Sequence, residues 1–320
     1  MLPFGIIRIL FQYKGSKGAV AIITNQKSSS FDTINKNLVA RFLPVVKIHT
    51  WGGLGSQLHA LALEFILKEK YPSRRFHFVV HSSGVTKRNV EADIFDENFG
   101  FKDDFGSKTI RFNHKFGKMK NFLVKLLFKS RFVVNCNDDS GIGSIKLWTV
   151  SVRGHYTNIT LSRDLVSALW TRLFESSNNR FSIDQNRYLA IHYRLGDLET
   201  LPNKSPIEAK RVVGISSVVL ADKKIKQINI YSDSTFTSMN YLKTLELYGT
   251  LHTRNLTPIE TILECSLSQV FIGTNSKLSV WITIFRGFHS LSSNTYLPSG
   301  LASFHLKRQM RNIGGMFHEY

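Results

Sequence analysis

The chain has 320 residues, of which 42% are hydrophobic, and a formal charge of +19 at pH 7. Its length exceeds that of most single cores and predicts two domains of roughly 150 residues each. The hydrophobic content excludes a disordered chain. Two cysteines in this length exclude a disulfide framework, so we expect Cys136 and Cys265 to be buried thiols of a reducing compartment. The charge favours anionic partners, which include nucleic acid, phosphorylated metabolites and anionic lipid.

The first 44 residues have no long hydrophobic period and are predicted to form an irregular N-terminal extension. Residues 1–14 are apolar, but Arg8 interrupts them and no small-residue cleavage site follows. This stretch is also too short to span a bilayer. We therefore expect the chain to be made and kept in the cytoplasm.

The pattern of a parallel α/β domain begins at residue 45. An apolar run at 45–49 predicts a strand, and a short glycine-containing loop then leads into a helix that ends near Pro72. A second strand is predicted over residues 76–81. This strand, helix, strand order indicates an α/β domain, which we assign to residues 45–155.

The segment 109–132 is rich in Lys and Arg and contains no acidic residue. Its apolar residues recur at helical spacing from Phe116 onwards, with lysines between them. The pattern predicts an amphipathic helix whose apolar face packs in the core. The alternative is a basic helix that rests on an anionic membrane at its inner face, where lipid-linked acceptors are found.

The second half of the chain alternates regularly between strands and helices. Strands are predicted over 188–193, 228–232, 250–253 and 270–274, with helices between them and after the last. This alternation indicates a doubly wound Rossmann-like domain, assigned to residues 156–320.

Polar residues follow each strand of this second domain. In an open parallel sheet ligands bind beyond the carboxyl ends of the strands, so these residues are candidates for a site. An arginine beside small hydroxyl residues and a helix start suits a diphosphate. The alternative is that the small polar residues are only turn and N-cap residues. The positions are Arg194, Asp197, Asp233, Ser234, Arg254, Asn255, Thr274, Asn275 and Ser276.

Five segments together resemble a known family. In the second half, "HYRLGD" (192–197), "YSDS" (231–234) and "FIGTNSKLS" (271–279) are similar to the His-x-Arg-x-Gly-Asp, Ser-Asp-Asp and Gly-Thr/Asn-x-Ser-Ser segments of the α1,2/α1,6/protein-O-fucosyltransferase superfamily. Upstream, "WGGLGSQLHALAL" (51–63) resembles the Gly-Gly-Leu-Gly-Asn-Gln opening of the bacterial α1,2-fucosyltransferases of glycosyltransferase family 11, and "VRGHYTNI" (152–159) resembles their Gly-Tyr-Phe-Gln-Ser segment. The resemblance covers about residues 45–285.

The resemblance implies an α/β, GT-B-like fold, in which two Rossmann-like doubly wound domains face each other across a cleft. It implies inverting, metal-independent transfer of fucose from GDP-fucose to a hydroxyl of a glycan, in an α1,2 linkage to galactose, with no cofactor. Arg194 would grip the β-phosphate and stabilise the leaving GDP. The other residues that the resemblance assigns to the donor are His192, Asp233, Ser234, Thr274, Asn275 and Ser276.

The chemistry of sugar transfer agrees with this assignment. Negative charge builds on the departing diphosphate, and a cation must stabilise it in the transition state. The chain contains no Asp-x-Asp triplet that could supply a metal site, so Arg194 is the candidate cation. An inverting transfer also benefits from a general base near the acceptor hydroxyl. The candidates are Asp197, Glu199 and His59, in that order.

The glycine-led segment is predicted to lie on the acceptor side. The dinucleotide spacing Gly-x-Gly-x-x-Gly is not met, because Leu58 stands where its last glycine would be. We therefore expect Gly52, Gly53 and Gly55 to form a wall that lets backbone approach the sugar. Gln57 and His59 on the following helix are assigned to the same acceptor side.

Three alternatives remain at this point. Leu195, Ser56 and the single acid of "YSDS" depart from the family pattern, so another nucleotide sugar could be the donor. The charge of +19 and the 24 Phe, 10 Tyr and 4 Trp residues are compatible with a nucleic-acid-binding protein, although no such signature is present. A transferase-like domain that only binds glycans is the third alternative. We expect a nucleotide sugar and a glycan, which can be lipid-linked, as partners and no nucleic acid.

Overall fold

The computed structural model describes residues 9–12, 20–23, 43–82, 109–113, 126, 128–174, 187–195 and 206–320. The chain divides into two compact units, Met1–Leu43 and Pro44–Tyr320. In the first unit, strands β1 (Ile9–Gln12) and β2 (Val20–Ile23) form an antiparallel pair. The prediction of an irregular extension did not anticipate this ladder.

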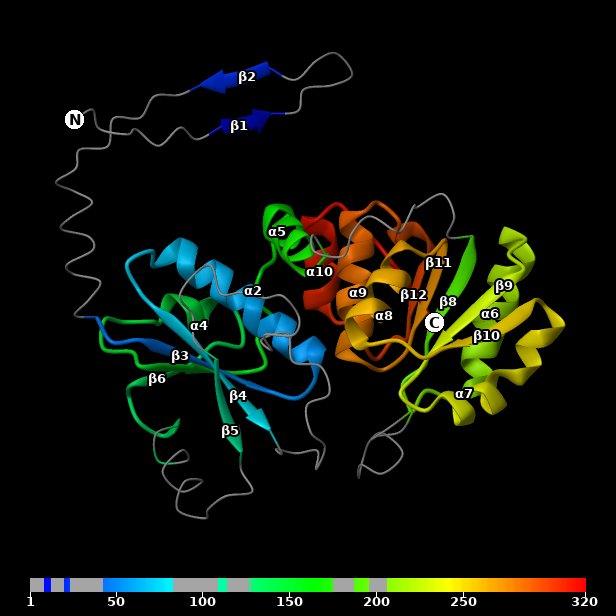
Figure 1. Cartoon of the computed structure of the whole chain (residues 1–320), viewed down its shortest axis with the longest axis horizontal. Helices are drawn as coiled ribbons and strands as arrows, with labels where there is room; N and C mark the ends of the chain where they lie inside the picture. The colour runs from blue at the N-terminus through cyan, green and yellow to red at the C-terminus, as the bar shows by residue number, and fades with distance from the viewer. Residues whose placement is uncertain are drawn as a thin grey trace. The chain divides into compact units, whose positions relative to one another are not determined.

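The second unit contains two separate parallel sheets (Figure 1). The N-terminal sheet has the strand order β5-β4-β3-β7-β6, and all its pairs are parallel. Its strands are β3 (Val46–Trp51), β4 (Phe76–Ser82), β5 (Thr109–Asn113), β6 (Val133–Asn135) and β7 (Ser151–Arg153). Strand β7 lies between β3 and β6, so the last two strands of this sheet are in reverse chain order. In the C-terminal sheet described below, the corresponding strands follow chain order.

Helix α2 (Leu54–Lys70) connects β3 to β4 and covers one face of this sheet. Val46 and Ile48 of β3 are fully buried in the same core cluster as Leu58 and Leu61 of α2. The apolar residues of α2 lie on more than one side of the helix, which explains why most of it is buried. The other helices that the structure describes before the second sheet are α4 (Asp139–Gly143) and α5 (Arg163–Phe174).

The C-terminal sheet has six parallel strands in the order β10-β9-β8-β11-β12-β13. Its strands are β8 (Tyr188–His192), β9 (Gln227–Tyr231), β10 (Thr250–Arg254), β11 (Val270–Gly273), β12 (Thr295–Leu297) and β13 (His318–Glu319). In chain order this is the 3-2-1-4-5-6 arrangement of a doubly wound fold. The helices are α6 (Ala209–Lys223), α7 (Thr235–Leu242), α8 (Pro258–Leu267), α9 (Lys277–Phe288) and α10 (Phe304–Asn312), with short 3-10 helices η4 (Lys243–Leu247) and η5 (Ser292–Asn294).

The two faces of this sheet enter different core clusters. Leu189 and Ile191 of β8 pack in a cluster with residues of α6, whereas Ala190 packs in the cluster that contains α8 and α9. The second cluster also contains Val46 of β3 and Leu58 of α2. A continuous apolar core thus joins the N-terminal sheet to the C-terminal one, and this explains why Pro44–Tyr320 is one compact unit.

The strands predicted from the sequence are confirmed within two residues of their ends. The predicted α/β class with two parallel sheets is therefore the observed one. Cys136 and Cys265 are buried free thiols, as expected. Strands β6, β7, β12 and β13 were not predicted. They are two or three residues long, too short for a clear alternating pattern.

The basic segment 109–132 begins with a strand that was not predicted, before the start of the expected helix. Thr109–Asn113 is β5 and pairs with β4. Of the helix expected from Phe116 onwards, most residues lie outside the described part of the chain. Leu126 is described and is 57% exposed. Among the described residues, no helix is both long and apolar enough to cross a membrane.

Arg286 on α9 is fully buried and has backbone carbonyls as its main partners. Its guanidinium donates to Ser268 O at 2.6 Å, to Cys265 O at 3.1 Å and to Leu291 O at 2.9 Å. Its Nε donates to Thr295 Oγ1 at 2.7 Å. Burial lowers the pKa of Arg286 to about 9. Because the carbonyls at the C-terminal end of α8 carry partial negative charge, this single side chain holds α8, α9 and β12 together.

Candidate functional site

The carboxyl ends of β8 and β11 lie side by side and form the topological switch point of the C-terminal sheet. Gly273 of β11 pairs with His192 of β8. From here the chain runs to α6 after β8 and to α9 after β11, and these helices belong to different faces of the sheet. A ligand crevice forms at such a point in doubly wound folds. The structure therefore brings together the two strand ends that carry Arg194 and 274–276.

The loop after β8 is fixed by side chains from the neighbouring strand ends. Thr274 Oγ1 donates to His192 O at 2.9 Å and accepts the backbone N–H of Arg194 at 2.8 Å. Asp233 Oδ1 accepts the backbone N–H of Leu195 at 3.0 Å. Thr274 is fully buried. In this structure Thr274 and Asp233 thus hold the backbone that carries Arg194, which is itself half-buried.

The N-terminus of α9 is the second part of this region. Ser276 is its N-cap, and its hydroxyl accepts the backbone N–H of Leu278 at 3.1 Å. Asn275 beside it is exposed. Lys277 is the first residue of the helix, and no acidic residue lies in the first turn. The positive end of the helix therefore has no carboxylate of its own to offset it, which favours an anion.

The side chain of His192 points under α9. Its Nδ1 lies 2.8 Å from Ser279 Oγ, and the residue is 8% exposed. Burial, with a further effect of Arg194, lowers the pKa of His192 to about 3. His192 is therefore neutral at physiological pH and anchors β8 to α9. Ser234 likewise has a local partner, because its hydroxyl donates to Thr237 Oγ1 at 3.1 Å.

The glycine-led loop meets α9 directly. An added Cβ on Gly55 would lie 2.8 Å from Lys277 Cβ and 2.9 Å from the backbone N of Leu278. Trp281 Nε1 donates to Gly55 O at 3.0 Å, and Lys277 Nζ donates to Ser56 Oγ at 3.2 Å. The close approach predicted for these glycines is thus observed at Gly55, but the partner is the backbone of α9.

The other two glycines differ in their roles. Gly52 has a φ of +92°, a conformation that side-chain-bearing residues rarely adopt, so it is needed for the turn. Gly53 has a φ of −75°, and an added Cβ would meet nothing within 4 Å. Only Gly55 therefore lies in the contact between the two sheets' helices.

Gln57 and His59, predicted on the acceptor side, are buried. Gln57 is fully buried and its amide donates to Gly52 O at 3.4 Å. His59 is 1% exposed and its ring packs 4.9 Å from that of Trp281 on α9. Burial, then Lys277 and His155, lowers the pKa of His59 to about 3. A ring enclosed between α2 and α9 cannot reach an acceptor hydroxyl, so the structure does not support His59 as a general base.

Asp197 and Glu199, the first two candidates for the general base, lie outside the described residues. Among the described residues, no three His, Cys, Asp or Glu side chains are grouped closely enough to hold a metal ion.

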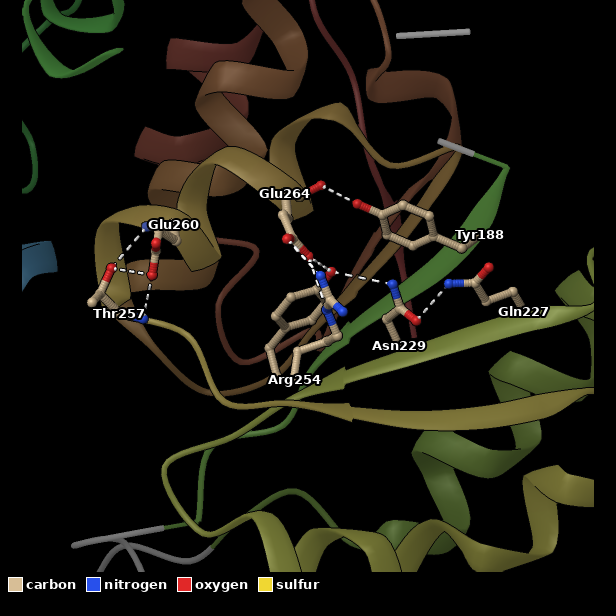
Figure 2. A network of polar contacts seen from close by, with 8 residues as sticks. Tyr188, Gln227, Asn229, Arg254, Thr257, Glu260 and Glu264 are labelled. Atoms are coloured by element: carbon tan, nitrogen blue, oxygen red, sulfur yellow. Dashed lines mark hydrogen bonds and ion pairs between the residues drawn. The ribbon is translucent and has the colours of Figure 1, made fainter. Parts of the chain in front are cut away.

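A polar cluster that the sequence did not predict lies on the α8 side of the C-terminal sheet (Figure 2). Glu264 on α8 accepts from Tyr231 Oη at 2.7 Å and from Arg254 Nη2 at 2.9 Å, and it is 7% exposed. Its backbone carbonyl accepts from Tyr188 Oη at 2.9 Å. The hydrogen bond to Glu264 raises the pKa of Arg254. The ion pair leaves this end of the row of strand ends close to neutral.

Lys277 and Glu264 are the polar residues of this region that the sequence analysis did not predict. Lys277 had a usable signal, because it directly follows the N-cap Ser276 at the end of a strand. Arg254 was noted as a strand end without a role. Glu264 had no signal, because an acid inside an amphipathic helix is ordinarily exposed.

No protein-family profile matches the sequence, and no curated protein is similar to it. Similar solved structures include the heptosyltransferase WaaC of E. coli with ADP (10% identity, 86% of this chain and 92% of that chain, TM-score 0.41). A glycosyl transferase of family 9 from Veillonella parvula has 11% identity, 79% and 80% coverage and a TM-score of 0.40. A proposed UDP-N-acetylglucosamine 2-epimerase from Listeria monocytogenes has 8% identity, 80% and 79% coverage and a TM-score of 0.42.

Proposed function

We propose that the protein is a nucleotide-sugar-dependent glycosyltransferase that moves a sugar to a hydroxyl of a glycan. The observation that carries this proposal is the meeting of the ends of β8 and β11 at the switch point, with Arg194 on one and the start of α9 on the other. Two cations, Arg194 and Lys277, and a helix N-terminus without first-turn acids suit the diphosphate of such a donor.

The proposed donor is GDP-fucose, which the segments around residues 192–197 and 271–279 favour through their resemblance to the fucosyltransferase superfamily. Its nucleoside would lie towards Arg254 and Glu264, because this end of the row is close to neutral. The diphosphate would lie at Arg194, Asn275 and Lys277. Another nucleotide sugar remains the alternative donor.

In the proposed reaction the acceptor hydroxyl attacks the anomeric carbon from the side opposite the diphosphate, in a cleft between the two sheets. The bond to the diphosphate breaks and its electron pair leaves with the phosphate oxygen. Arg194 and Lys277 stabilise the charge that develops there. Thr274 and Asp233 act as positioning residues that keep Arg194 in place. Asp197 is the proposed general base, and the acceptor is a galactose hydroxyl in an α1,2 linkage.

The donor is tested with purified protein and the nucleotides GDP, ADP and UDP, followed by their sugar conjugates. Thermal stabilisation by GDP and slow release of GDP from GDP-fucose are expected. Stabilisation by ADP or UDP but not by GDP would mean that the donor is another nucleotide sugar, while the proposed reaction class would stand. Stabilisation by oligonucleotides with no effect of any nucleotide sugar would refute the transferase.

The residues are tested by substitution. Arg194→Ala is expected to lower the rate of donor cleavage by about 10²–10³. Lys277→Met is expected to weaken donor binding, and Ser56→Ala separates that effect from the loss of the Lys277–Ser56 hydrogen bond. Arg311→Ala, an exposed charge on α10, is the control for the change in net charge. An unchanged turnover rate in Arg194→Ala would refute the assignment of Arg194 as the cation that stabilises the leaving diphosphate.

A further inference from the structure

A basic and apolar surface lies at the amino edge of the C-terminal sheet, where the strands begin. Tyr188 of β8 and Thr250 of β10 both pair with Gln227 of β9. The residues just before these three strands therefore lie beside one another. They are at the edge opposite the strand ends that carry Arg194, so this surface is separate from the candidate site.

Two hollows share Lys226 on this edge. The first has a volume of about 510 Å³ and is lined by four cations, Arg187, Lys223, Lys224 and Lys226, together with Ile225 and Gln269. The second has a volume of about 600 Å³ and is lined by Lys226, Glu246, Tyr248, Gly249, Thr250 and Leu251. We name the set Arg187, Lys223, Lys224, Lys226, Leu247 and Tyr248 the amino-edge surface.

Most of these cations are not neutralised by the described residues around them. Lys223 pairs with Asp222 at 3.1 Å. Arg187, Lys224 and Lys226 are exposed, and their side chains make no ion pair with any described residue. Glu246 is the acid among the described residues that line these hollows. The surface therefore keeps a net positive charge in a chain of +19.

Two large exposed apolar side chains belong to this region: Tyr248 lines the second hollow together with Lys226, and Leu247 precedes it in the chain. Leu247 is 81% exposed and Tyr248 is 45% exposed. The backbone N–H of Thr250 donates to Lys226 O at 2.7 Å, and an added Cβ on Gly249 would lie 2.5 Å from that oxygen. Gly249 thus allows the turn that carries Leu247 and Tyr248 to lie against Lys226.

We propose that the amino-edge surface docks on an anionic lipid bilayer. Lys224, Lys226 and Arg187 would lie at the level of the lipid phosphates, where each cation contributes to binding. Leu247 would enter the boundary between headgroups and acyl chains, and Tyr248 suits that boundary because its ring is apolar and its hydroxyl polar. A polyanion such as DNA would take up the cations but would leave Leu247 in water. A bilayer accommodates both features.

The test measures co-sedimentation of the full chain with vesicles of phosphatidylcholine alone and of phosphatidylcholine with phosphatidylserine. Binding is expected only to the second kind. The double variant Lys224→Glu/Lys226→Glu is expected to lower the partition coefficient by about tenfold or more. Leu247→Ser, which keeps every charge, is expected to lower it by several fold.

The matched control is Lys210→Glu, at the other end of α6 from Lys223. Its side chain is 81% exposed, and the helix places it about 20 Å away. This variant is expected to bind vesicles like the unmodified protein. Lys210→Glu changes the net charge half as much as the double variant does. A fall in the logarithm of its partition coefficient at least half that of the double variant would therefore mean that net charge alone governs binding, and would overturn the proposal. So would unchanged binding in the double variant, or an unchanged partition coefficient in Leu247→Ser.

Discussion

Replacing Gly55 by alanine is expected to strain the contact between α2 and α9. The added Cβ would lie 2.8 Å from Lys277 Cβ and 2.9 Å from both the carbonyl carbon of Lys277 and the backbone N of Leu278. Ordinary contact begins at 3.4 Å, so the helices must separate by about half an ångström or more. Two of the three atoms belong to the backbone of α9, and that backbone cannot move without the rest of the helix.

The cost follows from overpacking and from the hydrogen bonds that span the contact. Overpacking costs about 1–3 kcal/mol, and the separation also lengthens the 3.0 Å hydrogen bond from Trp281 to Gly55. The better helix propensity of alanine returns up to about 1 kcal/mol. We expect a net loss of about 2 kcal/mol, which corresponds to a fall in Tm of roughly 4–8 °C for a unit of this size.

The assay is thermal and urea unfolding, with Gly53→Ala as the matched control two residues away. Gly53 has an ordinary φ and open space around its Cβ position. Alanine there loses some N-cap preference but also restricts the unfolded chain, so its stability should stay within about 0.5 kcal/mol of the original. Equal stability of the two variants would refute the argument that Gly55 is required by the approach of α9.

Three further outcomes are expected. The pKa values of His49, His59 and His192 are lowered to about 4, 3 and 3, mainly by burial. The neutral forms of these histidines therefore stabilise the fold fully above the unfolded pKa of about 6.5, and this stabilisation is lost as pH falls towards 3. At about pH 5 each histidine lowers the free energy of unfolding by roughly 2 kcal/mol, which is large against the total free energy of unfolding of about 5–15 kcal/mol. Thermal unfolding between about pH 7.5 and 5 measures this, and a pH-independent Tm would contradict it. Arg286→Ala should lower the free energy of unfolding in urea by at least about 3 kcal/mol, because several carbonyls lose their donor, and Arg286→Lys should not restore it. The control is Arg311→Ala, at an exposed position, and similar stabilities of the two alanine variants would count against the role of Arg286. Glu264→Gln should both destabilise the protein and weaken nucleotide binding, because it weakens the hydrogen bonds to Arg254 and Tyr231. If stability and nucleotide binding both stayed the same, the proposed role of this cluster would be contradicted.

The sequence determined the class of the fold because its signals are local. The apolar runs at β3, β4, β8, β9 and β11 are long enough to be recognised. A helix follows β3, β8, β9 and β11, an order that favours parallel pairing. The position of Arg194 at a strand end also follows from the sequence. The short strands β6, β7, β12 and β13 could not be predicted, since two or three residues form no recognisable period.

The partners of individual side chains depended on the tertiary structure. In the sequence, Gly55 and His59 resemble residues that face a ligand. In the structure both pack against α9, which is more than 200 residues further along the chain. Thr274 and Asp233 end strands as predicted, but their oxygens accept backbone N–H groups of the loop after β8. The sequence placed these residues on the right elements because element type depends on near neighbours. Which group each side chain meets depends on how distant helices pack, and only the folded chain decides that.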